Sequence, residues 1–442
     1  MEPLEAFSRL EPLHDHAVLL ESAEGPEKLA SFSHILVNPE ASLRLKDGRV
    51  EASNGWSAVL GEGGDPLHPV RLFTGAPRME GEGHRFSGGM VGYLSYDLAR
   101  YWERLPSRTV DDFTFPDLEM DLFLDGLLFD HRTRQLYYHH LGRDRSREVM
   151  EELKTGGGSC ERPTVGRIEV NASEDEFKRM VEEAKSYIAE GEVFQVVLSK
   201  RFRLHTRGGL LGFYKALRRL NPSPYMYYIK MDGRRIVGSS PEMLVRVEDG
   251  LVETYPIAGT RPATGDPKRD EAAARSLLLD MKERAEHVML VDLARNDLGR
   301  VSEHGSVRVA DFMTVQKYSH VMHMVSRVVG RLKGGLDSLD VVRAVFPAGT
   351  VSGAPKVRAM EIIEELEPSR RGPYAGAVGY FSLNGCCDFA ITIRTLVADG
   401  EDAYIQAGAG IVADSNPEAE WLETEHKARA LLRALEEAEG ES

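Results

Sequence analysis

Four glutamates arranged as two pairs are the residues of this sequence whose types and spacing could bind a metal ion. Glu283 and Glu286 are three residues apart in DMKERAEHVMLVDLARNDLG, and Glu420 and Glu423 repeat that spacing in PEAEWLETEHKARALL. Residues three apart on a helix point the same way, so each pair presents two carboxylates together. If the two helices face each other, four acids converge and a hard cation such as Mg²⁺ would offset their repulsion. Two solvated helix surfaces would have the same pattern.

Both segments have the signals of helices. The first consists mostly of good helix formers and ends at Asn296–Gly299, and the second has Pro417 near its start. In the first segment the positions i, i+3, i+4 and i+7 of one helical face are Glu286, Met289, Leu290 and Leu293. This spacing predicts a buried face that contains a carboxylate in need of a partner.

Composition limits the class of protein. A chain of 442 residues with 42% hydrophobic content can build one large or two ordinary domains, and a net charge of -15 argues against a nucleic-acid surface. No apolar run reaches the roughly 18 residues of a membrane span, and the first residues lack signal-peptide features. The three cysteines, Cys160, Cys386 and Cys387, lack zinc spacing. We therefore expect a cytoplasmic enzyme with no membrane or nucleic-acid partner.

The order of patterns predicts an N-terminal region over residues 1–155 and a second domain over residues 165–436. The first region reads mostly as strands, and the glycine-rich segment LKTGGGSCERP, 153–163, is the best linker candidate. The second begins with a helix capped by Ser173 and Glu176, followed by strands and a hairpin that turns at Asp249–Gly250.

Two further motifs suggest ligand sites, each with a plainer alternative. FPAGTVSGAPKVRAM runs from a glycine-rich loop into a helix, so Thr350, Ser352 and Lys356 could hold an anion at the helix N-terminus, although an ordinary capped helix start fits equally well. His320 and His323 resemble a metal pair in spacing. On a strand, however, residues three apart point to opposite faces, so we do not expect a zinc site.

The last third of the chain contains a candidate anion site. CCDFAITIRTLV and AYIQAGAGIVADS read as paired strands, with Arg394 interrupting the first. A buried guanidinium needs a carboxylate, from the protein or from an acidic ligand. Gly408 and Gly410 remove side chains nearby, which suits close approach of a ligand or a bulge. The combined hypothesis is a carboxylated small molecule held by magnesium at one end and by Arg394 at the other.

The motifs taken together resemble those of the chorismate-utilising enzymes, most closely the large subunits of anthranilate synthases. The resemblance covers nearly the whole chain and is densest from Ser173 to Leu435. Its blocks include GEVFQVVLS, NPSPYMYY, GSSPEMLV, PIAGTRP, KERAEHVMLVDLARNDLGRV, HVMHMVS, FPAGTVSGAPKVRAM, RGPYAGAVGY, IRT and QAGAGIVADSNPEAEWLET. It implies an α/β (α+β) fold in which antiparallel sheets pack on each other and are flanked by helices.

The resemblance assigns roles to matching positions. Glu286 and Glu423 correspond to direct Mg²⁺ ligands that grip the ring carboxylate of chorismate, with Glu283 and Glu420 holding water ligands or positioning the ion. The matching substrate-binding positions are Gly259, Thr260, Tyr374, Arg394, Gly408, Ala409 and Gly410. The matching catalytic positions are Glu242, His323, Thr350 and Lys427.

The implied reaction adds ammonia at C2 of chorismate, releases the C4 hydroxyl and then expels pyruvate to leave anthranilate. Glu242 would protonate the departing hydroxyl, so we expect its pKa to be raised, and His323 would act in the loss of pyruvate. Ala258 stands where aminodeoxychorismate synthases carry a nucleophilic lysine, and Gln195 stands where isochorismate synthases carry a water-activating lysine. Direct use of ammonia is therefore favoured over water. The alternatives are an aminodeoxychorismate synthase subunit and a non-catalytic amino-acid-sensing subunit.

Two partners follow from the resemblance. No cysteine looks like the nucleophile of a glutaminase, so a separate glutamine amidotransferase subunit would supply ammonia in a hetero-oligomer. The positions that match the family's tryptophan feedback site are Glu21, Ser22, Pro224, Tyr225, Met226, Gly379 and Tyr380. The segment ASFSHI departs from the Arg-Tyr-Ser-Phe-like pattern that often follows LLES. A strand and a proline-rich turn in the core would have the same residues.

Overall fold

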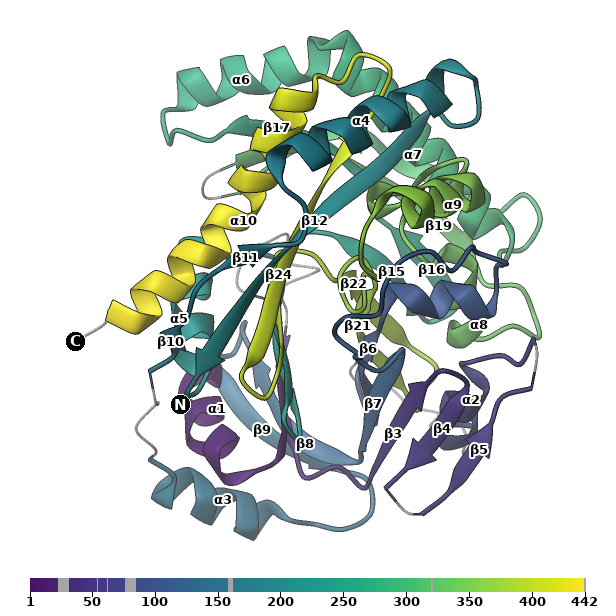
Figure 1. Ribbon diagram of the computed structural model, residues 1–442. Coiled ribbons are helices and arrows are strands. Elements are labelled where there is room, and N and C mark those ends of the chain that lie inside the picture. The colour runs from purple at the N-terminus through teal and green to yellow at the C-terminus, as the bar shows by residue number, and fades with distance from the viewer. Residues whose placement is uncertain are drawn as a thin grey trace.

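Two antiparallel sheets packed face to face form the body of the protein (Figure 1), which confirms the predicted fold class. The structure is a computed structural model, and it describes residues 1–22, 32–53, 55–61, 63–75, 85–157, 162–318 and 321–440. The main hydrophobic core lies between the sheets and takes side chains from both, such as Tyr227 and Val397 from the first and Val91 and Phe389 from the second.

The first sheet contains, in spatial order, β10 (Thr164–Val165), β12 (Gln195–Arg207), β24 (Asp402–Ile411), β23 (Thr395–Asp399), β14 (Arg234–Ser240), β13 (Tyr225–Met231), β1 (His16–Glu21), β2 (Phe32–Val37), β8 (Asp125–Asp130) and β9 (Gln135–His140), while β11 (Glu169–Val170) and β20 (Gly353–Ala354) pair with β12. The second contains β17 (Ile257–Pro262), β19 (Val321–Arg331), β16 (Leu251–Thr254), β15 (Met243–Glu248), β22 (Cys387–Ile391), β21 (Ala377–Ser382), β6 (Gly89–Leu94), β7 (Leu118–Phe123), β3 (Ala41–Lys46), β4 (Arg49–Ala52) and β5 (Ser57–Val59), with β18 (Arg308–Lys317) on β19.

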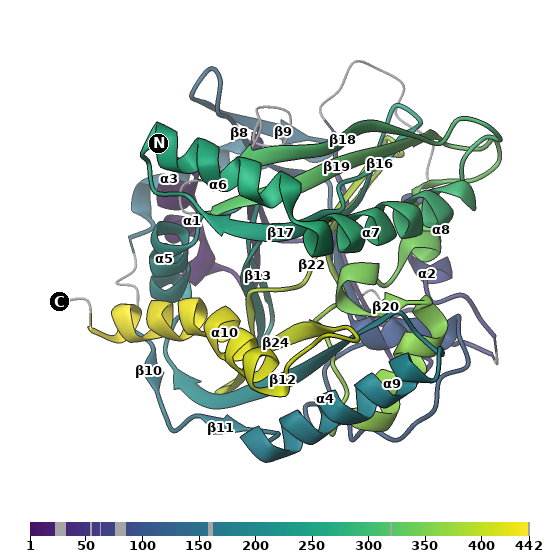
Figure 2. The ribbon, with the colours of Figure 1, turned by 90° about the horizontal axis from the view of Figure 1, so that it is seen from above.

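The helices are α1 (Pro3–Leu10), α2 (His68–Thr74), α3 (Ser146–Thr155), α4 (Glu174–Ala189), α5 (Leu211–Leu220), α6 (Pro267–Leu279), α7 (Met281–Gly299), α8 (Ser338–Val345), α9 (Lys356–Leu366) and α10 (Pro417–Gly440). Three short 3₁₀ turns are η1 (Glu11–Leu13), η2 (Tyr96–Tyr101) and η3 (Gly349–Val351). Helices α4, α5, α9 and α10 pack on the first sheet, and α6, α7 and α8 on the second. In Figure 2, α7 lies beside β17 of the second sheet and α10 beside β12 and β24 of the first, both on the face turned toward the viewer.

Strands from the first 155 residues lie in both sheets. In the first sheet β1 pairs with β13 along its whole length, and in the second β6 pairs with β21. The N-terminal region and the later part of the chain therefore share their hydrogen-bond ladders and their core. Three helices, α1, α2 and α3, also belong to this region, which the sequence patterns assigned mostly to strands.

Several predicted elements are confirmed with their local causes. Helix α4 begins at the predicted capping box, in which Ser173 and Glu176 bond reciprocally to each other's backbone. Strands β15 and β16 form the predicted hairpin around Asp249, which has the positive φ that such a turn requires. The Asp280 side chain caps α7 by accepting hydrogen bonds from the first-turn N–H groups.

Two predicted segments differ from the structure. The strand expected through Arg394 is split, because β22 belongs to the second sheet and β23 to the first. Arg394 lies in the connection between them with φ +50°, a conformation that periodicity does not reveal. The start of the expected linker is also ordered: Leu153 is buried in α3, while residues 158–161, with Cys160, lie outside the described residues.

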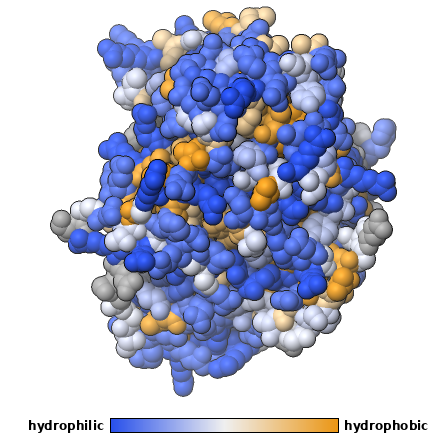
Figure 3. Space-filling model, in the orientation of Figure 1, coloured by the Kyte–Doolittle hydropathy of each residue, from blue (hydrophilic) through white to orange (hydrophobic). Residues whose placement is uncertain are grey.

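Polar side chains cover most of the face seen in Figure 3, interrupted by small hydrophobic patches. The buried hydrophobic side chains form three clusters in the interior. Among the described residues, no helix is long and apolar enough to span a membrane.

Candidate functional site

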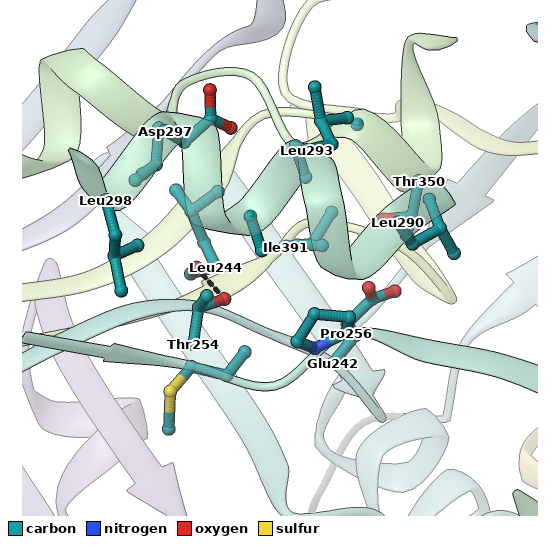
Figure 4. A pocket seen from close by; sticks show the side chains of 15 residues that line it. Glu242, Leu244, Thr254, Pro256, Leu290, Leu293, Asp297, Leu298, Thr350 and Ile391 are labelled. Atoms are coloured by element: carbon teal, nitrogen blue, oxygen red, sulfur yellow. Dashed lines mark hydrogen bonds between the residues drawn. The ribbon is translucent and has the colours of Figure 1, made fainter. Parts of the chain in front are cut away.

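A pocket at the junction of the two sheets contains Glu242 (Figure 4). Its volume is about 420 Å³ including its open mouth, and its other walls are largely apolar, with Leu244, Leu290 and Ile391 among them. The Glu242 side chain points toward α7 beside Thr350 (Figure 4). Burial raises the pKa of the Glu242 carboxyl to about 8, and the nearby Thr350 hydroxyl and the charges of Lys427 and Arg394 offset this only in part. The expected raised pKa is confirmed.

Arg394, in the connection between the sheets, lies close enough to Glu242 for their charges to interact. The guanidinium is partly buried, and it has no ion-pair partner within 4 Å among the described residues. Burial lowers its pKa, and Glu242 is the group whose charge opposes this effect. An anion bound beside this guanidinium would offset the cost of burying its charge.

His323 on β19 is held as a neutral base at the edge of the site. Burial lowers the pKa of the imidazole. Its Nδ1 lies 3.1 Å from the Gly259 carbonyl oxygen and 3.1 Å from the Thr260 hydroxyl. A carbonyl oxygen only accepts, so Nδ1 carries the proton and Nε2 has the free lone pair. His320, the other histidine of the motif, lies outside the described residues.

Two glycines of β24 lie against polar side chains. A side chain at Gly408 would meet the Tyr374 hydroxyl at 2.7 Å, and one at Gly410 would meet the Gln195 amide nitrogen at 2.5 Å. The glycines therefore make room for these two polar groups. Ala409 points its side chain into a hydrophobic cluster, so it can offer only backbone to a ligand.

The four predicted metal ligands are near one another but do not form a compact cluster. Burial and the charges of Glu283 and Glu423 raise the pKa of Glu286, and burial and Glu423 raise that of Glu420. No group of three or more His, Cys, Asp or Glu side chains within the described ranges is close enough to hold a metal ion. A magnesium site at these four acids stays a prediction.

Two of these carboxylates form ion pairs within the protein. Glu283 is drawn to Arg261, with 3.2 Å between Oε1 and Nη1, and Glu423 is drawn to Lys427 at 2.7 Å. Lys427 also donates to the Gly408 carbonyl at 2.8 Å. The donor set still fits Mg²⁺, which takes one or two carboxylates and fills its remaining positions with water and ligand oxygens. Glu286, whose pKa is raised by like charges, is the group that such an ion would relieve.

The buried face of α7 differs from the predicted face. The residues that it buries are His287, Leu290, Val291, Asp297 and Leu298. Glu286 lies at the border of this face and stays partly exposed, which leaves it free for a ligand. His287 is 0% exposed, its Nε2 lies 2.6 Å from the Ser326 hydroxyl, and burial lowers its pKa to about 4. Counting the same i, i+3, i+4 spacing from His287 in place of Glu286 would have predicted the buried face correctly.

The glycine-rich loop before α9 does not offer its predicted anion-binding groups. Lys356 Nζ donates to Asp297 and to the Val345 carbonyl oxygen, each at 2.8 Å, and the Ser352 hydroxyl donates to the Ala348 carbonyl at 2.8 Å. These side chains tie the loop to α7 and α8. Helix α9 begins after Pro355 without a side-chain cap, so the ordinary capped start does not describe it either, and Thr350 is the one residue of the three whose side chain is not bonded in this way.

A second pocket, of about 640 Å³ including its mouth, lies between β1, β13, β21 and β22. All seven positions that match the family's regulatory site line it: Glu21, Ser22, Pro224, Tyr225, Met226, Gly379 and Tyr380. Asp388 adds a carboxylate, and it accepts hydrogen bonds from Tyr225 at 2.9 Å and Arg246 at 2.8 Å. Distant segments thus meet in a cavity with aromatic and charged walls.

Comparisons with known proteins agree with this geometry. A family model described as "chorismate binding enzyme" matches residues 15–433. The chain is 50% identical to anthranilate synthase component 1 of Methanothermobacter thermautotrophicus, over 98% of this chain and 92% of that protein. It is 44% identical to aminodeoxychorismate synthase component 1 of Bacillus subtilis, over 99% and 96%. The crystal structure of anthranilate synthase component I from Streptococcus pneumoniae superposes with a TM-score of 0.83 at 36% identity, covering 92% of this chain and 93% of that one.

The raised pKa of Glu242 predicts a pH-dependent stability. In the folded protein the carboxyl keeps its proton up to about pH 8, whereas in the unfolded chain it ionises near its ordinary pKa of 4.5. Between these values the folded state binds more protons, so the free energy of unfolding falls as the pH rises. The free energy of unfolding, measured with urea from about pH 5 to about pH 8, should fall less steeply with pH for Glu242→Gln than for the parent protein. Glu436→Gln, at an exposed position, is the control. If the free energy of unfolding falls equally steeply in all three proteins, the assignment is contradicted.

Proposed function

Because the chain belongs to the family of chorismate binding enzymes, we propose that it is the large subunit of an anthranilate synthase. In this role it is a lyase that converts chorismate and ammonia into anthranilate, pyruvate and water. The observation that carries the proposal is a protonated Glu242 beside Arg394, because a proton donor and a carboxylate receptor in one pocket suit the loss of a hydroxyl from an acidic substrate.

Chorismate carries two carboxylates, and the site offers a receptor for each. Arg394 and Tyr374, with the backbone at Gly408, receive the enolpyruvyl carboxylate, since no carboxylate in the described part of the chain forms an ion pair with this guanidinium and the neighbouring Glu242 is protonated. The ring carboxylate lies at the opposite end, toward Glu286 and Glu423. Holding both ends fixes the ring against Glu242 and lowers the entropic cost of the reaction.

Magnesium is the proposed cofactor at the acidic end. Glu286 and Glu423 would hold it directly, and Glu283 and Glu420 would hold its water ligands or position it. When bound, the ion supplies positive charge that fixes the ring carboxylate and offsets its repulsion from the glutamates. Lys427 lies between Glu423 and the Gly408 carbonyl and links this end to the substrate wall.

Glu242 is the general acid of the first step. Ammonia forms a bond to C2 while the bond from C4 to its hydroxyl breaks, and the Glu242 proton leaves with that hydroxyl as water. With a pKa of about 8, the carboxyl is protonated at neutral pH without losing its acidity. Thr350 is the neighbouring hydroxyl that orients it.

His323 is the base of the second step. Its Nε2 accepts the C2 proton as the bond between the ring and the enolpyruvyl oxygen breaks, which leaves an aromatic ring and the enolate of pyruvate. The enolate becomes pyruvate when its methylene carbon takes up a proton. The hydrogen bond from Nδ1 to Gly259 holds the ring in the required tautomer, and Thr260 stands beside it.

Ala258 and Gln195 distinguish this function from related ones. Ala258 is buried on β17 and offers no amine for covalent attack on the ring. Gln195 is buried near Gly410 and cannot act as a base toward water. One relative is an aminodeoxychorismate synthase component, so that activity is the enzyme alternative, and product analysis separates the two.

A glutamine amidotransferase subunit is the proposed source of ammonia. The two described cysteines, Cys386 and Cys387, are buried, and burial raises the pKa of both thiols. Neither has the lowered pKa of a glutaminase nucleophile. The physiological enzyme is therefore a hetero-oligomer.

Tryptophan is the proposed feedback inhibitor, and the second pocket is its site. Its walls include the rings of Tyr225 and Tyr380, which suit an indole. Asp388 and Glu21 supply negative charge for an ammonium group, although both also bond to protein partners.

The proposed activity can be measured directly. The purified chain with chorismate, Mg²⁺ and ammonium should produce anthranilate, detected by its fluorescence, and pyruvate in equal amount. Glutamine should not replace ammonium until the amidotransferase subunit is added. An aminated product without pyruvate would point to aminodeoxychorismate synthase, and no loss of chorismate would refute both enzymes.

The proposed role of Glu423 as a metal ligand can be tested by substitution. Glu423→Gln removes a charge that binds Mg²⁺, so we expect a loss of turnover of roughly 100-fold and a higher Mg²⁺ requirement. Thermal unfolding with and without Mg²⁺ should show less stabilisation by the ion than in the parent protein. Glu436→Gln, on an exposed face of the same helix, is the control. Unchanged turnover of Glu423→Gln at saturating Mg²⁺ would contradict the assignment.

Feedback regulation by tryptophan requires that tryptophan bind to the second pocket. Calorimetry should detect tryptophan binding at or below millimolar concentration, and Ala390→Val, which adds bulk to the pocket wall, should weaken it at least about tenfold. Tyrosine serves as the control ligand. If tryptophan at several millimolar binds neither protein, the chain has no such regulation.

A further inference from the structure

A buried ion pair that lies outside the predicted site connects most of its walls. Glu367 and Arg371 follow α9, and their side chains are 2% and 1% exposed. Arg371 Nε donates to one carboxylate oxygen of Glu367 at 2.9 Å, and Nη2 donates to the other at 2.6 Å. A bidentate pair of this kind has one well-defined geometry.

Stability alone does not account for the pair. Replacing a buried ion pair with apolar side chains is often neutral or stabilising, because the attraction between the charges scarcely exceeds the cost of removing them from water. What such a pair can contribute is a fixed position for the groups that are bonded to it.

The groups oriented by the pair belong to the substrate walls. The Ser199 N–H and hydroxyl both donate to Glu367 Oε1 at 2.8 Å, and Ser199 is the register partner of Gly408. Arg371 donates to the Val351 carbonyl at 2.6 Å and to the Val197 carbonyl at 2.8 Å. Val351 directly follows Thr350, the residue beside Glu242.

The guanidinium also contacts two aromatic rings. Its central carbon lies 5.7 Å from the centre of the Tyr374 ring and 4.7 Å from that of Tyr96. Tyr96 comes from the N-terminal region, where its N–H donates to the Gly372 carbonyl at 2.7 Å. The pair thus joins the N-terminal region to the wall that carries Tyr374.

We propose that Glu367 and Arg371 are positioning residues for the reaction. They hold the Thr350 loop and the wall of Tyr374 and Gly408 at the separation that chorismate requires, while touching no substrate themselves. The inference rests on the proposed function. A displacement of either wall by about 1 Å is enough to lower turnover about 100-fold.

Arg371→Lys tests the proposal, because lysine keeps the charge but cannot make the bidentate pair and the two carbonyl bonds together. We expect kcat/KM for chorismate, measured as chorismate consumption per folded protein, to fall at least about tenfold, with KM raised and kcat lowered. The control is Arg145→Lys, which alters the buried pair of Arg145 and Asp125 on β8, far along the first sheet from the site. It should change only the unfolding temperature.

The double variant Glu367→Met/Arg371→Met separates positioning from stability. It removes both charges, so no unpaired charge is left buried, and we expect folded protein whose kcat/KM stays at least about tenfold low. If the folded fraction of either variant retains kcat/KM within about twofold of the parent, the pair is only structural and the proposal is overturned. A parent chain that consumes no chorismate refutes the proposed function instead.

Discussion

The difference between paired and unpaired buried charges organises this protein. Arg246 is bound to Asp388 and Lys356 to Asp297, and both pairs tie segments that are distant in the sequence. Arg371 is bound to Glu367 four residues before it, and this pair is tied to β12 through Ser199 and the Val197 carbonyl. Glu242 has no ion-pair partner among the described residues and keeps its proton through burial, and Arg394 is likewise without a carboxylate partner there. Removing charge from water is costly, so an unpaired group persists where a ligand or a reaction uses it.

The position of this site follows from the sheets. The chain leaves the second sheet after β22 and enters the first at β23, and Arg394 lies at that crossing. Glu242 lies at a similar crossing between β14 and β15, and its carbonyl accepts a hydrogen bond from the Ile391 N–H at 3.0 Å. Side chains at such crossings escape the tight packing between the sheets, which leaves room for a substrate.

One hairpin joins the two pockets. Strands β21 and β22 contribute Val378, Gly379, Tyr380, Asp388 and Ala390 to the second pocket. At the open end of the same hairpin, Tyr374 precedes β21 and Arg394 follows β22, and the Ala375 N–H donates to the Thr392 carbonyl at 2.9 Å. The hairpin that lines the second pocket is therefore also the element that carries both proposed receptors for the enolpyruvyl carboxylate.

Local patterns determined much of this protein. The spacing of apolar residues and the capping residues predicted α4, α7 and α10 and the hairpin at Asp249, because such signals depend only on nearby residues. The fold of antiparallel sheets flanked by helices was implied by the family resemblance. Motif blocks brought Glu242, Arg394 and the four glutamates to attention and implied a raised pKa for Glu242.

Tertiary structure decided how these residues are used. It split the strand at Arg394, turned the buried face of α7 from Glu286 to His287, and drew Glu283 and Glu423 toward Arg261 and Lys427. It also turned Lys356 away from any ligand and made Glu367 and Arg371 a support for the site. Most of these outcomes depend on charges and packing partners from other segments of the chain, whose burial exists only once both sheets have assembled.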